Sequence, residues 1–198
     1  MALFSRKKEF QDRYGERIPP GQTVTEKWPV LHHGSVPRVD LAKWDFRAFG
    51  EVEEELRFTY EQFTALPMAE VRCDIHCVTH WSRMDNAFFG VPFKEFMKRV
   101  HLRPAARFVI IHCEGGYTTN LPLEACMDDG VLWAWKHDGK DLAPEHGWPL
   151  RLVVPKRYFW KSAKWARGIE FSAVDKPGFW EQNGYHNNAD PFAEERYW

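Results

Sequence analysis

The sequence predicts an α+β domain with a mixed β-sheet. Strand-like segments outnumber helix-like ones, and the two kinds do not alternate regularly as they do in a doubly wound fold. Hydrophobic residues make up 44% of the 198 positions, which is enough to build a core of ordinary size. We therefore expect one domain at residues 28–198, preceded by a polar, weakly ordered N-terminal arm at residues 1–27.

The predicted strands are short apolar or alternating runs that end at turn residues. They are expected at residues 44–50, 56–60, 71–78, 107–113, 131–136, 150–155 and 168–174. The segment His137-Asp-Gly-Lys predicts a hairpin after the fifth of these strands, because Asp-Gly favours a type I′ turn. Apolar residues at helical spacing predict a helix at 91–100, and shorter helices are expected at 59–68 and 122–127.

The charge pattern favours a small anionic ligand over nucleic acid. The formal net charge is −1, yet one segment near the C-terminal end is basic without any acidic residue. It contains Arg151, Lys156, Arg157, Lys161, Lys164 and Arg167. A local basic segment in a neutral chain indicates one small anion, and we expect no nucleic-acid partner. A solvated basic face beside an edge strand is the structural alternative.

Membrane and secretion signals are not evident in the sequence. No apolar run reaches the roughly 18 residues that a membrane span needs. The first residues lack the apolar core of a signal peptide and a twin-arginine pair. We therefore expect a cytoplasmic protein whose four cysteines stay reduced.

The densest group of reactive side chains lies in residues 72–83. It consists of Arg72, Cys73, His76, Cys77, His80 and Arg83. Cys77 follows a predicted strand, and its cationic neighbours favour the thiolate, which binds soft metals or attacks carbonyl groups. A buried structural cysteine, a zinc site shared with Cys73 and a Cys–His hydrolase site remain alternatives.

A second group of candidate residues follows at 146–167. It is predicted to run from a loop through the apolar strand of Arg151 into a basic, aromatic loop around Lys164. Backbone amides together with Lys and Arg at a strand end suit a phosphate group. A guanidinium inside an apolar strand also requires a polar or anionic partner.

Together these segments resemble the molybdopterin domain of the sulfite oxidase family. The resemblance covers roughly residues 28–175 and is carried mainly by His146-Gly-Trp-Pro-Leu-Arg-Leu-Val-Val-Pro and the later Lys161-Ser-Ala-Lys164-Trp. It implies the mixed-sheet fold of that family, a molybdopterin cofactor, and Cys77 as the protein ligand to molybdenum. It further implies that the cofactor is bound by His32, His33, Cys77, Cys113, His146, Arg151, Ser162, Ala163 and Lys164.

The residues after Cys77 are similar to those of the bacterial methionine-sulfoxide-reductase branch. That branch has a Trp-Ser pair in this region, as Trp81-Ser82 here, whereas the Asn-Arg-Arg run of true sulfite oxidases is absent. We therefore identify the chain as a member of the short cytoplasmic branch of the family. The resemblance implies oxygen-atom transfer with a small-molecule substrate and an electron donor or acceptor protein.

The expected catalytic residues are Cys77, His80 and Arg83. A single arginine beside a histidine binds a doubly charged oxyanion weakly, and Trp81 suits a substrate with an apolar part. We therefore expect reduction of a neutral sulfoxide or N-oxide. Sulfite-type oxidation and a non-catalytic domain that binds a pterin or another anion are the alternatives.

Overall fold

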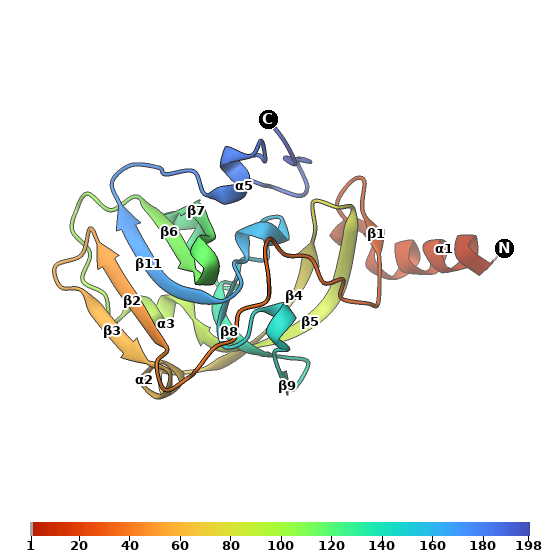
Figure 1. Cartoon of the computed structure of the whole chain (residues 1–198). Coiled ribbons are helices and arrows are strands. Elements are labelled where there is room, and N and C mark those ends of the chain that lie inside the picture. Colours follow the sequence, from red (N-terminus) through yellow and green to blue (C-terminus); the bar gives the residue numbers. More distant parts are fainter. Residues whose placement is uncertain (1) are drawn as a thin grey trace.

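The computed structural model describes the backbone of residues 2–198 and the side chains from residue 8 onward. Its strands form two sheets that pack against each other (Figure 1). The first sheet contains β1 (Thr23–Val24), β4 (Ala69–His76), β5 (Trp81–Pro92), β8 (Leu132–His137), β9 (Lys140–Asp141) and β10 (Arg151–Val153). The second contains β2 (Asp45–Gly50), β3 (Leu56–Thr59), β6 (Phe108–Cys113), β7 (Thr118–Pro122) and β11 (Ala166–Ser172).

The helices are short except for the first. The α-helices are α1 (Ala2–Tyr14), α2 (Tyr60–Thr64), α3 (Phe93–Met97), α4 (Leu123–Cys126) and α5 (Phe179–Gln182). Single 3₁₀ turns are η1 (Gly15–Arg17), η2 (Glu114–Gly116), η3 (Pro144–His146) and η4 (Phe159–Lys161). Within the described residues, no helix combines the length and the apolar character needed to cross a bilayer.

Both sheets are mixed, which confirms the predicted α+β class. In the first sheet β1 runs parallel to β5, and β5 pairs antiparallel with β4 and β8. In the second sheet the order is β3-β2-β11-β6-β7, with β11 parallel to β2 and antiparallel to β6. Antiparallel pairs need only short turns, which explains why few helices connect the strands.

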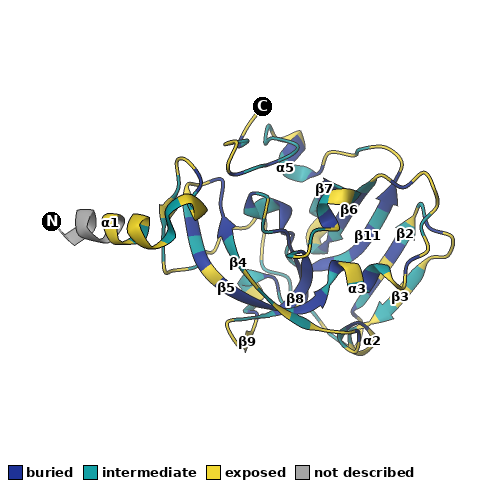
Figure 2. Cartoon of the chain, turned by 180° about the vertical axis from the view of Figure 1, so that it is seen from behind, coloured by how far each residue is buried: buried dark blue, intermediate teal, exposed yellow. Residues whose placement is uncertain are grey.

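The main core lies between the two sheets and is strongly aromatic. The ring of Phe46 on β2 lies 4.8 Å from that of Trp133 on β8 and 4.9 Å from that of Phe63 on α2. All three side chains are fully buried. Figure 2 shows the same division, with buried ribbon concentrated in the facing strands and exposed ribbon on α1.

A smaller cluster packs on the other face of the first sheet. Side chains alternate along β8, so Trp133 faces the main core while Leu132 and Ala134 face the smaller cluster. Trp28 and Phe159 pack against this second cluster. Both residues also line the cavity described below, together with Ala163 of the main core.

The seven predicted strands are all present, with shifted ends. Two substantial strands were not expected, β5 and β7. β5 buries the polar residues Ser82 and Asn86 among its apolar ones, so it lacks the alternation by which strands are predicted. It also extends to Pro92, and the helix expected at 91–100 is therefore reduced to α3.

Close packing of β5 against β8 depends on one glycine. A Cβ atom on Gly90 would lie 1.9 Å from the backbone oxygen of Trp133, at a point where the register of the two strands shifts. Any other residue there would force the strands apart. The residues expected to form a weakly ordered arm contain helix α1 and strand β1, and β1 is hydrogen-bonded to β5.

Candidate active site

A tight turn between β4 and β5 carries Cys77. The Cys77 amide donates to the carbonyl oxygen of Trp81 at 2.8 Å, and the His80 amide donates to that of Cys77 at 3.1 Å. His80 has a φ of 67°, in the left-handed region, which closes the turn and directs its side chain away from that of Cys77. Cys77 Sγ lies 3.1 Å from Thr79 Oγ1. Burial raises the pKa of the Cys77 thiol, while the Thr79 contact and the cations Arg196 and Lys164 lower it.

The Cys77 thiol faces a cavity of about 550 Å³. Its walls come from the segment 28–37, the Cys77 turn, η2, the η4 region and the chain after β11. Predicted site residues on this wall are His32, His33, Cys77, Arg151, Ser162, Ala163 and Lys164. The fold therefore brings together side chains that are up to 132 positions apart in the sequence, His32 and Lys164 being the most distant.

Arg151 is fully buried, and its hydrogen bonds go to carbonyl groups. Its Nη1 donates to the carbonyl of His146 at 2.8 Å and its Nη2 to that of Ser162 at 2.7 Å. The guanidinium carbon lies 4.2 Å from the centre of the Phe159 ring. Burial lowers the pKa of Arg151 to about 9. No ion pair found among the described side chains includes this residue, so a cation lies at the cavity without a protein counterion.

Lys164 is the second cation at the cavity. Its Nζ donates to the carbonyl oxygens of Leu31 at 2.9 Å and Glu145 at 2.6 Å. Burial first, and then the charge of Arg151, lower the pKa of Lys164 to about 7. An anionic group near both cations would stabilise their charged forms. These residues fit a cofactor that carries a phosphate group.

Three aromatic rings pack together at this part of the wall. Trp28 lines the cavity and stacks on His146, with ring centres 4.0 Å apart and an interplanar angle of 12°. The His137 ring lies 4.3 Å from the Trp28 ring. His146 is absent from the cavity wall, and its Nδ1 has no hydrogen-bond partner among the described residues. Its clearest contact is thus with Trp28, which it supports from outside the cavity.

The two expected histidines of the segment before β2 pack against different aromatic rings. His32 packs edge-on against Trp165 at 5.6 Å, and its Nδ1 donates to the carbonyl oxygen of Gly34 at 3.0 Å. The His33 ring lies 4.3 Å from that of Phe179. This segment therefore closes the cavity by contacts with aromatic residues that follow η4 and β11.

Besides His146, three more predicted site residues lie off the cavity wall. Cys113 belongs to the main core. His80 Nδ1 donates to the carbonyl oxygen of Gly21 at 2.9 Å. Arg83 forms an ion pair with Asp138 at 2.6 Å and also donates to His137 at 2.9 Å. Their assigned roles in cofactor or substrate binding remain predictions.

The alternatives for Cys77 can be compared with this geometry. Among the described side chains, no three His, Cys, Asp or Glu residues are grouped as a metal ion would require. The imidazole of His76 contacts Ser82 Oγ at 2.8 Å, and that of His80 contacts Gly21. Neither histidine is hydrogen-bonded to the thiol, so neither a zinc group nor a Cys–His pair is formed. A single thiolate suits a metal that arrives with other ligands from its own cofactor.

Sequence reasoning missed several aromatic residues of the cavity. Tyr117, Trp180 and Tyr185 line it together with Trp160. The Tyr185 ring lies 4.9 Å from each of the two tryptophan rings. Burial raises the pKa of Tyr185, and the nearby Tyr197 and Cys77 raise it further. These residues share no motif in the sequence. Tyr117 lies between η2 and β7, whereas Trp180 and Tyr185 lie in the C-terminal segment, and only the fold brings them to one cavity.

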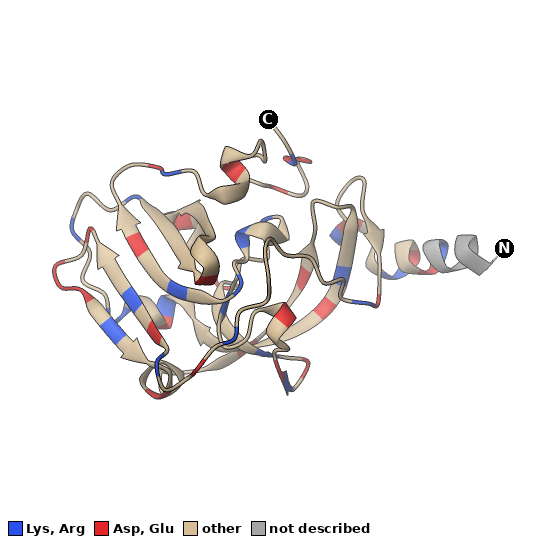
Figure 3. Cartoon of the chain, viewed as in Figure 1, with Lys and Arg blue, Asp and Glu red and all other residues tan. Residues whose placement is uncertain are grey.

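Charge is distributed without a dominant face. Acidic and basic positions are interspersed over the visible elements (Figure 3). Several cations of the basic segment from Arg151 to Arg167 are paired with acidic groups: Lys161 pairs with Glu181 in the interior, and the partly exposed Arg167 pairs with Asp45 and Glu114. This arrangement agrees with a small ligand at the cavity.

Comparisons with known proteins point to one family. Residues 33–180 match the family model described as the oxidoreductase molybdopterin binding domain. The uncharacterized oxidoreductase YuiH of Bacillus subtilis is 47% identical over 182 residues, which span 91% of this chain and 92% of that protein. A putative protein-methionine-sulfoxide reductase subunit, YedZ1 of Azospira oryzae, is 26% identical over 172 residues, spanning 85% of this chain and 65% of that protein.

More distant relatives share the fold. The NADPH nitrate reductase of Emericella nidulans is 30% identical over 194 residues. The match spans 83% of this chain but only 22% of that enzyme. The crystal structure of the sulfane dehydrogenase SoxCD from Paracoccus pantotrophus superposes with a TM-score of 0.66 at 22% identity, covering 72% of this chain and 41% of that one. The resemblance inferred from the motifs is thereby confirmed. The chain belongs to the molybdopterin-binding oxidoreductases of the sulfite oxidase-like family.

Proposed function

We propose that this enzyme transfers an oxygen atom at a molybdenum centre bound by Cys77, and that it reduces a neutral sulfoxide or N-oxide. The observation that carries the proposal is the cavity itself. It has the Cys77 thiol at one wall and the buried Arg151, which lacks a protein counterion, at another. When bound, molybdenum–molybdopterin supplies two-electron oxygen-atom transfer.

The residues at the cationic part of the cavity would hold the cofactor. Arg151 and Lys164 supply charge-assisted donors for its phosphate and pterin oxygens, with Ser162 and Ala163 between them in the chain. The Trp28 ring provides a flat surface beside Arg151, whose guanidinium carbon lies 5.5 Å from its centre. Cys77 would contribute the thiolate ligand.

Two features favour an uncharged substrate. Arg83, the first arginine after Cys77 in the sequence, is paired with Asp138 and lies off the cavity wall. The cavity that Cys77 lines also has an aromatic wall, with Trp81, Trp160, Trp180 and Tyr185. Such a wall excludes water and packs against the apolar substituents of a sulfoxide or N-oxide, while the Tyr185 hydroxyl supplies a donor for its oxygen. One relative carries a name that includes sulfoxide reduction, which supports the same substrate class.

The balanced reaction consumes two electrons and two protons. The S–O bond breaks, the sulfoxide becomes a thioether, and its oxygen leaves as water. Electrons must come from a separate donor, so we propose a redox-partner protein. All four cysteines are free thiols, which supports our proposal of a reducing, cytoplasmic location.

A paired activity measurement tests the substrate class. The value of kcat/KM for sulfoxide or N-oxide reduction, driven by an artificial electron donor, is expected to exceed that for sulfite oxidation. A sulfite value clearly above the other two would contradict the proposal and favour sulfite-type oxidation.

The metal ligand is tested by substitution. Cys77→Ser replaces a soft thiolate by a hard, mostly protonated hydroxyl of nearly the same size, so the fold should persist. We expect loss of the sulfur-to-molybdenum charge-transfer absorption and of activity by at least about 100-fold. Cys113→Ser and Cys73→Ser are the matched controls. If either control abolishes the absorption while Cys77→Ser keeps it, the assigned ligand is incorrect.

A further inference from the structure

The Cys77 turn is held from its outer side by residues near both ends of the chain. Gln22 Nε2 donates to the carbonyl oxygen of Cys77 at 3.0 Å. Arg196 Nη1 donates to the carbonyl oxygen of Val78 at 2.8 Å. In Figure 1 the red N-terminal and blue C-terminal segments both approach the linked ends of β4 and β5.

The N-terminal segment follows the turn closely. Gly21 accepts a hydrogen bond from the His80 side chain, and the Thr23 amide donates to the His80 carbonyl oxygen at 2.9 Å. Thr23 then pairs with Trp81 as β1 joins β5. Gln22 lies between these two contacts, so its position relative to Cys77 is fixed on both sides.

The C-terminal segment contacts the Cys77 turn through the buried guanidinium of Arg196. Arg196 is 7% exposed, its Nη2 reaches the carbonyl oxygen of Pro20 at 3.3 Å, and its guanidinium carbon lies 4.8 Å from the centre of the Tyr158 ring. Its ion pair with the half-exposed Glu194 is long, at 3.8 Å. The strongest contact of Arg196 is therefore with the Val78 carbonyl, 118 positions away.

We propose that Arg196 and Gln22 are positioning residues that hold the Cys77 turn so that the thiol points into the cavity. The carbonyl oxygen of a residue moves with its ψ angle, so the two hydrogen bonds restrict ψ at Cys77 and at Val78. The turn also contains a left-handed histidine, a conformation that the surrounding contacts must maintain. A ligand held in this way needs no reorganisation when the metal is bound.

The role rests on the proposed function, because it assumes that Cys77 is the metal ligand. The geometry itself can be tested without metal. Hydrogen exchange is measured in the cofactor-free protein over a peptide that includes Cys77 and His80, whose amides are hydrogen-bonded within the turn. Arg196→Met keeps an unbranched side chain but removes all donors. Exchange at these two amides should rise about tenfold, while β6 in the core stays protected.

Two further variants and a control sharpen the measurement. Arg196→Lys retains one donor and should restore most of the protection, and Gln22→Ala should raise exchange at the same amides. Arg72→Met is the control, since Arg72 lies on β4 but its side chain is exposed and pairs only with the exposed Glu70. It should leave the turn unchanged. Unchanged exchange at Cys77 and His80 in Arg196→Met, or an equal rise in β6, would overturn the proposal.

The loaded enzyme gives an independent readout. Arg196→Met should retain molybdenum and pterin, shift the charge-transfer absorption, and lower kcat with little change in KM; Arg196→Lys should reverse most of this. Unshifted absorption and an unchanged kcat would contradict positioning. Absence of molybdenum from the wild-type enzyme would instead contradict the proposed function, and the exchange data would still decide whether the turn is held by Arg196.

Discussion

At the scale of single residues, Arg151 combines complete burial with the lack of an acidic partner among the described side chains. Burial of a guanidinium is costly when carbonyl dipoles are its main partners. Phe159 covers one face of the group and two carbonyl oxygens occupy part of its edge. An anionic ligand in the cavity would supply the missing charge, which makes this residue the main expected determinant of cofactor binding.

The first prediction concerns Arg151. The Arg151→Ala protein should fold but retain cofactor about 10- to 100-fold more weakly, because a charge-assisted hydrogen bond contributes about 1.5–3 kcal/mol. The measurement is pterin and molybdenum content per chain after extended dialysis. Arg107→Ala is the matched control, since Arg107 also donates to two carbonyl oxygens but is exposed and off the cavity. Full occupancy in Arg151→Ala would show that the buried charge does not bind the cofactor.

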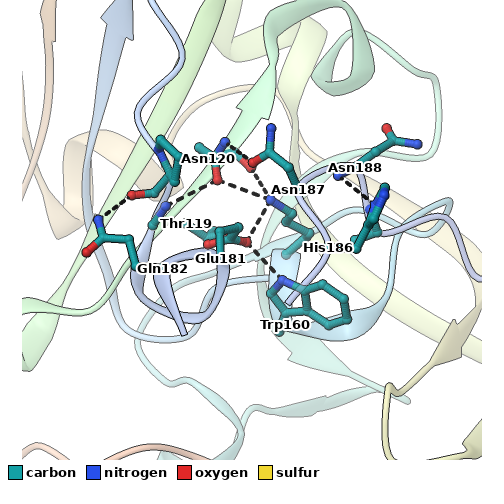
Figure 4. A network of polar contacts seen from close by, with 12 residues as sticks. Thr119, Asn120, Trp160, Glu181, Gln182, His186, Asn187 and Asn188 are labelled. Carbon is teal, nitrogen blue, oxygen red and sulfur yellow. Dashed lines mark hydrogen bonds and ion pairs between the residues drawn. The ribbon is translucent and has the colours of Figure 1, made fainter. Parts of the chain in front are cut away.

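At the scale of elements, a buried ion pair fastens η4, β7 and α5 to one another. Figure 4 shows its surroundings: Glu181 Oε1 lies 2.7 Å from Lys161 Nζ and accepts hydrogen bonds from Thr119 and from the Trp160 indole. Lys161 also donates to the Asn120 carbonyl oxygen at 2.8 Å. Burial lowers the pKa of Lys161, whereas the negative charge of Glu181 acts in the opposite direction and raises it. The network thus anchors Trp160, which forms part of the cavity wall.

The second prediction concerns this ion pair. Glu181→Gln leaves the buried Lys161 without its counterion and should lower the free energy of unfolding by about 3–5 kcal/mol. Denaturation by urea, followed by circular dichroism, measures the change. In the control Glu95→Gln, the pair with Lys98 is solvent-exposed, and the loss should stay below about 1 kcal/mol. Equal losses in the two variants would mean that the buried pair has no special role in stability.

At the scale of the whole molecule, the free energy of unfolding should depend on pH through three histidines around the site. Burial lowers the pKa of His76, His137 and His146, each to about 4. In the unfolded chain a histidine has a pKa of about 6.5. Between these values the unfolded state binds more protons than the folded state, so the free energy of unfolding falls as the pH falls from about 6.5 toward 4. Above this window the three groups are neutral in both states and contribute nothing.

The third prediction follows from this linkage. Replacing His137 by Gln should reduce the proton uptake on unfolding near pH 5 by about one proton, and the acid side of the stability curve should become less steep. Urea denaturation at several pH values between 4 and 8 provides the curve. His101→Gln, a change at an exposed histidine, should leave the slope unchanged. The same slope in His137→Gln and the wild type would show that His137 titrates alike in both states.

The sequence by itself determined the fold class, most of the strands and the family of the chain. Strands with regular patterning were predicted: β6 buries the apolar run from Val109 to Ile111, and β11 buries Ile169 and Phe171 on either side of the half-buried Glu170. β5 escaped prediction because it buries Ser82 and Asn86, whose partners His76 and Arg83 are known only from the fold. Local patterning reports which face of a strand is buried, and it fails where buried polar groups bind each other.

Only the tertiary structure decided which candidate residues share the cavity. His80 and Arg83 follow Cys77 within six positions, yet neither lines the cavity. His80 itself has the left-handed backbone conformation that closes the turn, and Arg83 pairs with Asp138, which lies 55 positions further along the chain. Tyr185 lies more than 100 positions from Cys77 and lines the same cavity. Residue type determines the chemistry that a side chain can perform, whereas strand pairing and packing over long distances determine where it acts.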